Sequence, residues 1–269
     1  MESGRVGRTL LAGGIELSWW EQGQGPTVLC LHETAASGEI WRPLADALDG
    51  EARTVAPDRR GWGASGAPEQ YSATTIAEQA EDAVALLDEL DAAPALACGA
   101  GLGAVAALDL LLRRADLIRA GVLVEPPLLA FVPEATEGLS ADLASVSKAV
   151  AAGGPAAALD LYLAGGLPYA GAGASRIPEP VAASAREHPL SLFAELPAVP
   201  AWSLHPSRMH RLQAPSRIVI AAGTPPPLRA AAEQLATHLG GSEIVRLGGE
   251  GLPHVDAAVE LAAAVRALL

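Results

Sequence analysis

The sequence has few of the residues that would tie it to a disulfide framework, a metal or a membrane. Its 269 residues include two cysteines, Cys30 and Cys98, and each lies in a short apolar run, where a free thiol acts as a small buried hydrophobe. The sequence shows no Cys/His spacing typical of a metal site. It also has no run of the ~18 apolar residues that a membrane span needs, and no secretory signal at its start. We therefore expect a soluble, cytoplasmic protein without disulfides or a metal.

Basic residues are scarce as well. Lysine and arginine total 18 against 31 aspartates and glutamates, which gives a net charge of −13. Such a chain is repelled by phosphate backbones and anionic membrane surfaces, so we expect neither nucleic acid nor a membrane as a partner. Half of the residues are hydrophobic, and the length suits one large domain or a core with one insertion.

Strand-like and helix-like segments alternate along much of the chain. A helix is expected from about Thr75 to Leu90, because Thr75 and Glu78 have the spacing of a capping box. The stretch from 127 to 213 has helical segments but no convincing strand. The predicted strands are 27–31, 53–56, 95–98, 120–125, 217–222 and 243–247. This order predicts an α/β fold, with a mostly parallel sheet and helices on both faces, interrupted by a helical insertion.

Several motifs resemble those of the α/β-hydrolase family. They are Gly23-Gln24-Gly25-Pro26 before a strand that ends at Leu31-His32, then Trp41, the loop from Asp58 to Ser65, and the segment from Leu252 to Asp256 before the last helix. The resemblance covers nearly the whole chain except the insertion, which corresponds to the variable cap of that family. It implies a core of residues 1–126 and 214–269 with a helical cap of residues 127–213.

The residues expected at the catalytic triad of that family differ from the family pattern. The nucleophile elbow of the family is Gly-x-Ser-x-Gly, and here it reads Gly99-Ala100-Gly101-Leu102-Gly103, so Gly101 stands where the serine belongs. The expected acid position, after Ala222-Gly223, continues with Thr224 and three prolines, and the expected histidine position is Gly251. Three losses in separate segments indicate a protein without the serine-hydrolase triad.

The same turn has a second interpretation. Gly99 to Ala104 also satisfies the relaxed dinucleotide pattern Gly-x-Gly-x-x-Ala, and Glu125 ends the following strand. Two strand–helix units and the 58–65 loop precede the turn, however. This position favours the hydrolase elbow.

Four residues are candidates for catalysis. Glu33 replaces a glycine of the family's oxyanion loop and is a possible general acid or base, unless it only bonds loop backbone or faces solvent. By resemblance, the backbone N–H groups of Thr34 and Leu102 face the oxyanion site, and the Thr34 hydroxyl is a further possible donor. Glu125 is either a second catalytic carboxylate or a salt-bridge anchor for the cap. His254 is either catalytic or packed at the start of the last helix.

The remaining candidates concern the ligand. Concentration of aromatic residues in the insertion, in a chain that is 4% aromatic, favours an apolar ligand held over the sheet edge, or else a small core of the cap itself. His205 could exchange protons there. The backbone of the elbow would also contact the ligand. His32 is interpreted as a structural residue of its loop. The expected substrate-binding residues are Trp41, Gly101, Leu102, Phe131, Tyr162, Trp202 and His205.

The triad pattern leads to an expectation about the reaction. We expect a cofactor-independent cyclisation, isomerisation or elimination of an apolar small metabolite, polyketide-like or terpenoid, because pocket shape and one or two polar groups can drive such steps. Two alternatives are a small-molecule-binding pseudoenzyme and a hydrolase with a relocated base, Glu33 or Glu125. The sequence leaves the oligomeric state open.

Overall fold

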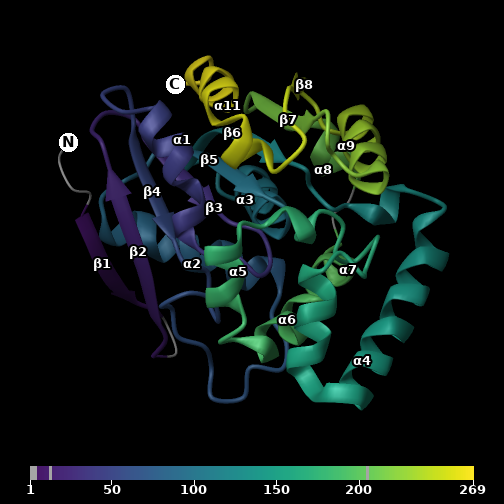
Figure 1. The fold of residues 1–269 in the computed structure, drawn as a ribbon. Coiled ribbons are helices and arrows are strands. Elements are labelled where there is room, and N and C mark those ends of the chain that lie inside the picture. The colour runs from purple at the N-terminus through teal and green to yellow at the C-terminus, as the bar shows by residue number, and fades with distance from the viewer. Residues whose placement is uncertain (1–4, 12–13, 204–205) are drawn as a thin grey trace.

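The chain builds one eight-stranded sheet in the order β1-β2-β4-β3-β5-β6-β7-β8 (Figure 1). The computed structural model describes residues 5–11, 14–203 and 206–269. Strands β3 to β8 are parallel to their neighbours within that group, and β2 joins them through an antiparallel pairing with β4. The strands are β1 Arg5–Leu10, β2 Glu16–Gln22, β3 Thr27–Leu31, β4 Arg53–Pro57, β5 Ala95–Ala100, β6 Ile118–Val124, β7 Ser216–Ala221 and β8 Ser242–Leu247. The expected mostly parallel α/β sheet is confirmed.

Helices cover both faces of this sheet, as expected. Because successive side chains of a strand point to opposite faces, Val28 and Cys30 pack toward α1 and α11, whereas Leu29 and Leu31 pack toward α2, α3 and α9. The helices of the core are α1 Arg42–Ala47, which follows a short 3-10 turn (η1 Gly38–Trp41), α2 Ile76–Glu89, α3 Leu102–Arg113, α9 Pro226–His238, α10 Pro253–Asp256 and α11 Ala258–Arg266. Each face therefore has its own apolar layer.

The capping box predicted at the start of α2 is confirmed. The Thr75 hydroxyl accepts a hydrogen bond from the Glu78 N–H at 3.1 Å, and the Glu78 carboxylate accepts one from the Thr75 N–H at 2.8 Å. The helix expected at the end of the chain is instead two, because the chain turns at Ala257 between α10 and α11.

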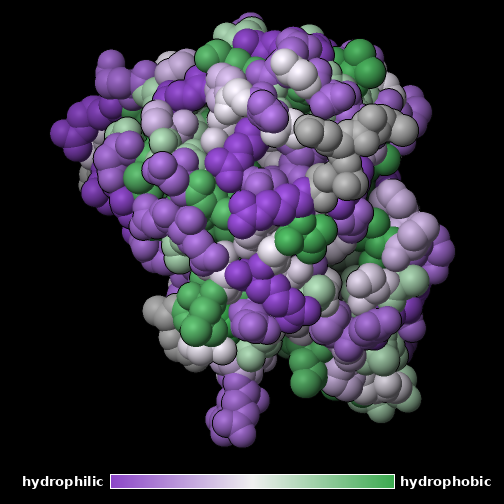
Figure 2. Space-filling view, turned by 90° about the vertical axis from the view of Figure 1, so that its left-hand side faces the viewer, coloured by the Kyte–Doolittle hydropathy of each residue, from purple (hydrophilic) through white to green (hydrophobic). Residues whose placement is uncertain are grey.

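Strands β1 and β2 were not predicted. These strands pair antiparallel at the sheet edge, where β1 exposes most of its side chains, including Val6 and Leu10. An edge strand of this kind lacks the continuous apolar run of a buried parallel strand. The side of the molecule that carries β1 is largely hydrophilic with separate hydrophobic patches (Figure 2), and the ion pair between Arg8 and Glu16 lies across this edge.

All described residues between β6 and β7 are helical or irregular, in agreement with the sequence. This segment gathers at one end of the sheet (Figure 1). Gly153 and Gly154 leave helical geometry and bend α4 in the middle. The elements are η2 Leu129–Phe131, α4 Ala135–Leu163, η3 Ala174–Arg176, α5 Glu179–Ala185, α6 Pro189–Glu195, α7 Ala198–Ala201 and α8 Pro206–His210. None of the helices in the described part of the chain is long and apolar enough to span a membrane.

Candidate active site

The turn between β5 and α3 has the sharp geometry that the glycine pattern predicts. Gly101 links the last strand residue to the first helix residue with φ 54° and ψ −126°, a conformation that favours glycine. A Cβ at Gly99 would lie 2.2 Å from the Gly103 carbonyl oxygen, and one at Gly103 would lie 2.2 Å from that of Leu31. Gly99 and Gly103 are thus required because other backbone atoms approach them closely. The N-terminus of α3 lies at the carboxyl end of the sheet.

Glu33 occupies the space beside this turn. A Cβ added to Gly101 would lie 2.7 Å from the Glu33 Cβ, closer than two such carbons can approach. A side chain at 101 and the glutamate at 33 therefore compete for one volume. The absence of a side chain at Gly101 is what lets Glu33 sit against the elbow.

The carboxylate of Glu33 lies beside the ring of His254. Glu33 Oε1 and His254 Nε2 are 3.3 Å apart, and both residues are buried. Both carboxylate oxygens and both ring nitrogens lack a hydrogen-bond partner among the described residues. The ring packs against Trp41 at a centroid distance of 4.5 Å. Buried polar atoms of this kind ordinarily have partners, so this pair is available to bond a water molecule or a substrate.

Electrostatics keep Glu33 ionised. Burial is the largest single influence and raises the pKa of Glu33. The interaction with His254, together with smaller contributions that include the charge of Arg59, outweighs burial and lowers the pKa of Glu33 below its ordinary value. At neutral pH, Glu33 is therefore a carboxylate, which accepts protons and hydrogen bonds.

A buried ion pair lies behind Thr34. Glu195 of α6 forms an ion pair with the guanidinium of Arg59. The Oε2 atom of Glu195 also accepts a hydrogen bond from the Thr34 hydroxyl at 2.6 Å. Because an ionised carboxylate only accepts hydrogen bonds, the hydroxyl must donate, and it has one proton. The donor that Thr34 retains for a ligand is its backbone N–H. Neither Glu195 nor Arg59 was singled out from the sequence, since 136 residues separate them.

His32 is a structural residue of the loop, as expected. Its Nε2 accepts the Arg59 N–H at 2.8 Å, so the proton is assigned to Nδ1, which lies 2.7 Å from the Glu33 carbonyl oxygen. Burial, together with the nearby charge of Arg59, holds the pKa of His32 well below its ordinary value. The ring is neutral in the folded protein.

This lowered pKa predicts acid destabilisation. Below about pH 6.5 the unfolded chain binds a proton at His32 that the folded protein does not bind, so the free energy of unfolding falls by up to about 1.4 kcal/mol per pH unit. Urea unfolding between about pH 7 and about pH 5 measures this slope. We expect a flatter slope for His32→Gln, and an unchanged slope in that variant would contradict the assignment.

Glu125 is engaged by other residues of the chain. It follows β6 in a left-handed conformation with φ 47°, and its oxygens bind Arg176 of η3 at 3.1 and 2.5 Å. The Thr224 hydroxyl donates to it at 2.6 Å. Arg176 also donates to the carbonyl oxygen of Gly251 at 2.8 Å. Thr224, which follows β7, and Gly251, which follows β8, thus take part in one hydrogen-bonded network that joins η3 to the core.

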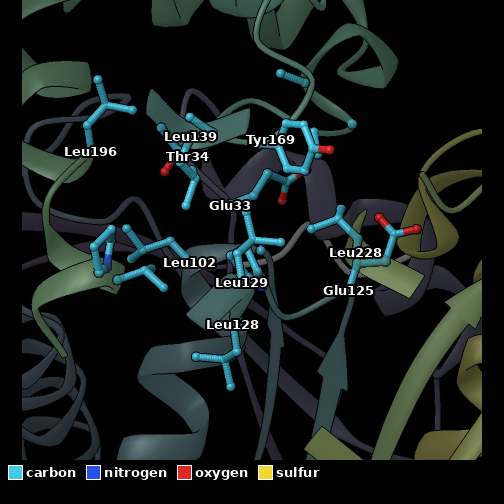
Figure 3. Close-up of a pocket in the computed structure, with 18 of the residues that line it drawn as sticks. Glu33, Thr34, Leu102, Glu125, Leu128, Leu129, Leu139, Tyr169, Leu196 and Leu228 are labelled. Carbon is cyan, nitrogen blue, oxygen red and sulfur yellow. The ribbon is translucent and has the colours of Figure 1, made fainter. Parts of the chain in front are cut away.

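A cavity of about 600 Å³ opens above Glu33. Figure 3 shows leucine side chains around Glu33 and Thr34, with Tyr169 on the same wall. These leucines come from the elbow, the inserted segment and α9. Those labelled are Leu102, Leu128, Leu129, Leu139, Leu196 and Leu228. The cavity is predominantly apolar with a few polar groups, which is typical of small-molecule sites.

The structure brings most of the expected ligand-binding residues to this cavity. Gly101, Leu102, Phe131, Tyr162 and Trp202 line it, as do the four catalytic candidates Glu33, Thr34, Glu125 and His254. The Trp202 Nε1 donates to Asp109 at 3.0 Å, which fixes the indole. Trp41 lies behind the His254 ring and supports the wall. His205 lies outside the described residues.

The competition between positions 33 and 101 can be measured. We expect Gly101→Ala to lower the free energy of unfolding by about 1–3 kcal/mol through overpacking, in addition to backbone strain. In a Glu33→Gly background the contact is gone and only the strain remains, so the same substitution should cost less. Chemical denaturation of the four proteins gives the coupling energy. Strictly additive effects would mean that Glu33 does not fill the space at the elbow.

The model of the alpha/beta hydrolase family matches residues 28–264. The chain belongs to this family. The turn at Gly101 is therefore the elbow of a hydrolase fold, and the dinucleotide interpretation is set aside. No group of three or more histidine, cysteine or acidic side chains suited to a metal occurs among the described residues.

Several proteins are similar to this chain. An epoxide hydrolase of Caballeronia sordidicola is 36% identical over 112 residues, 41% of this chain and 34% of the relative. A 2-(acetamidomethylene)succinate hydrolase of Mesorhizobium japonicum is 32% identical over 174 residues, 64% of this chain and 60% of the relative. The matches thus span about a third and three fifths of these relatives' lengths. An enol-lactonase structure from Burkholderia xenovorans LB400 superposes with a TM-score of 0.73, at 21% identity, over 97% of this chain and 99% of the lactonase, and shares the fold.

These relatives correct the reaction expected from the sequence. Cyclisation, isomerisation or elimination of a polyketide-like or terpenoid metabolite was wrong, because the related proteins are named as hydrolases. The expectation rested on the three triad positions that the sequence analysis found empty, at Gly101, after Gly223 and at Gly251. A hydrolase with a relocated base, Glu33 or Glu125, was one of the alternatives left open.

Proposed function

We propose that this protein hydrolyses an ester or lactone bond of a small, largely apolar molecule, with Glu33 as the base that activates water. The observation that carries the proposal is the buried Glu33 carboxyl group beside His254, at the floor of an apolar cavity and against the elbow of a hydrolase fold. In this proposal Gly101, Thr224 and Gly251 leave the family's triad positions without nucleophile, acid or base, and residues 127–213 act as the cap.

The first step requires a polarised carbonyl group. Leu102 is the first residue of α3, so its N–H is one of the four that have no acceptor within the helix, at the positive end of the helix dipole. Together with the Thr34 N–H it would hold the developing oxyanion. Glu195 and Arg59 fix Thr34 from behind.

Water then supplies the nucleophile. Glu33 takes a proton from the attacking water, the new C–O bond forms, and the tetrahedral intermediate expels the alcohol as the proton passes to its oxygen. The products are one carboxylic acid and one alcohol, or a hydroxy acid from a lactone. His254 stabilises the charged form of Glu33 and lies next to the proton path.

Labelled water distinguishes this pathway from direct attack by Glu33. A single turnover of a neutral alkyl ester in H2¹⁸O should place the label in the product acid and leave the mass of the Glu33 peptide unchanged. Label in Glu33 would mean that its carboxylate attacked the substrate, forming a mixed anhydride at the carbonyl carbon or an ester at the alkyl carbon, which water then opened at Glu33. We also expect hydrolysis to resist a serine-directed sulfonyl fluoride, and inactivation by that reagent, or no acid release from any neutral ester, would overturn the proposal.

A further inference from the structure

The charged groups at the cavity wall are paired with each other. Arg176 is the one guanidinium among the described lining residues, and Glu125 binds it through both carboxylate oxygens. Arg176 Nη1 also donates to the Gly251 carbonyl oxygen, and Glu125 is held by Thr224. The positive charge of Arg176 is therefore neutralised and its orientation is fixed.

The other charged groups of the cavity lining have partners as well. Glu195 is neutralised by Arg59, and Glu33 is an ionised carboxylate whose neighbour is His254. A ligand carboxylate in this cavity would meet the Glu33 carboxylate. Both Nη groups of Arg176 are already bound, and only its buried Nε has no partner. Burying a charge without a counter-ion is costly, and a like charge nearby adds to the cost.

We propose that this site accepts uncharged substrates and excludes those that carry a free carboxylate, and that Glu125 sets this selectivity by neutralising Arg176. The inference rests on the proposed hydrolysis at the same site and names its substrate class: a neutral ester or lactone with an apolar body. It separates this chain from the relative named for a substituted succinate, which is a dicarboxylate. Glu125 is then a specificity residue and not a second base.

Binding of two ligands of equal chain length tests the selectivity without any turnover. Decan-2-one is uncharged and decanoate carries a carboxylate, and titration calorimetry gives both dissociation constants. We expect the wild-type protein to bind decan-2-one at least about tenfold more tightly than decanoate. Equal binding of the two, tighter binding of decanoate, or no binding of either would overturn the inference.

Two variants assign the selectivity to the ion pair. In Glu125→Gln the guanidinium loses its counter-ion, so the ratio of the two dissociation constants should shift at least about tenfold in favour of decanoate. In the double variant Glu125→Gln with Arg176→Met, that gain should disappear. Unchanged binding of decan-2-one reports an intact cavity in each variant, and exposed Glu137→Gln is the matched control. A Glu125→Gln protein that binds decan-2-one but gains nothing for decanoate would remove Glu125 from this role.

The outcomes separate this inference from the proposed function. Selective binding of decan-2-one without hydrolysis of any neutral ester would overturn the function and leave the selectivity standing. Equal hydrolysis of a neutral ester and of its carboxylate-bearing analogue would overturn the selectivity and leave the function standing. If Glu125→Gln does not fold, the dissociation constants of the two ligands for the wild-type protein still test whether the site excludes carboxylates.

Discussion

Glu33→Gln should reduce the turnover number for a neutral ester by about 10²–10⁴, the range in which a positioned general base contributes. Glutamine has nearly the same shape but cannot take a proton from water. Because the substitution removes no apolar contact of the cavity, the dissociation constant of decan-2-one should remain close to the wild-type value. Initial rates and calorimetry on the same preparations measure both quantities.

Glu69→Gln is the matched control, because Glu69 is exposed and lies outside the cavity. It should keep wild-type turnover. A Glu33→Gln protein with unchanged turnover would exclude Glu33 as the base, and one that no longer binds decan-2-one would mean that the carboxylate supports the cavity itself. Only a loss of turnover with retained binding agrees with the proposed step.

Glu195→Ala should have the largest effect on stability. The variant leaves the guanidinium of Arg59 buried without its carboxylate, and breaking a buried ion pair in this way costs about 3–5 kcal/mol. It also frees the Thr34 hydroxyl, which loses its acceptor. Urea unfolding gives the free energy, and the turnover of the remaining folded protein reports the effect on the oxyanion loop.

The control is Glu179→Ala, which removes an exposed carboxylate from its ion pair with Arg186. Exposed pairs contribute about 0–1 kcal/mol, so this variant should be nearly as stable as the wild type. If the free energy of unfolding fell by a similar amount in both variants, the buried pair would stabilise the contact between α6 and the core no more than an exposed pair does.

Local sequence patterns predicted most of the core fold. The buried parallel strands are short apolar runs between turns, and the capping box at Thr75 marks the start of α2, so both features can be seen within a few residues. β1 was missed because an exposed antiparallel edge carries no such run, and β2 was missed because polar residues interrupt its buried apolar ones. The elbow was recognised from the spacing of its glycines, although only Gly99 is required by a contact close in sequence, with Gly103, whereas Gly103 itself lies against Leu31.

The site was only partly predictable. Glu33 and His254 were both candidates from their positions in family motifs, but their contact joins residues 221 positions apart (254 minus 33). The role of Glu195 carried no local signal, since a glutamate on a short helix is ordinarily a solvated residue. Its partners, Arg59 and Thr34, become its neighbours only when the inserted segment packs on the sheet.

By itself, the sequence determined the α/β architecture, the glycine at the elbow and the low number of charged groups, because periodicity, turn chemistry and composition are local properties of a chain. The tertiary structure decided which charges are neutralised. Glu125 could be a base or an anchor until Arg176 was seen to bind it, and Glu33 could face solvent until it was seen against Gly101 and His254. Electrostatic roles depend on distance and burial, and these are fixed only when distant segments pack together.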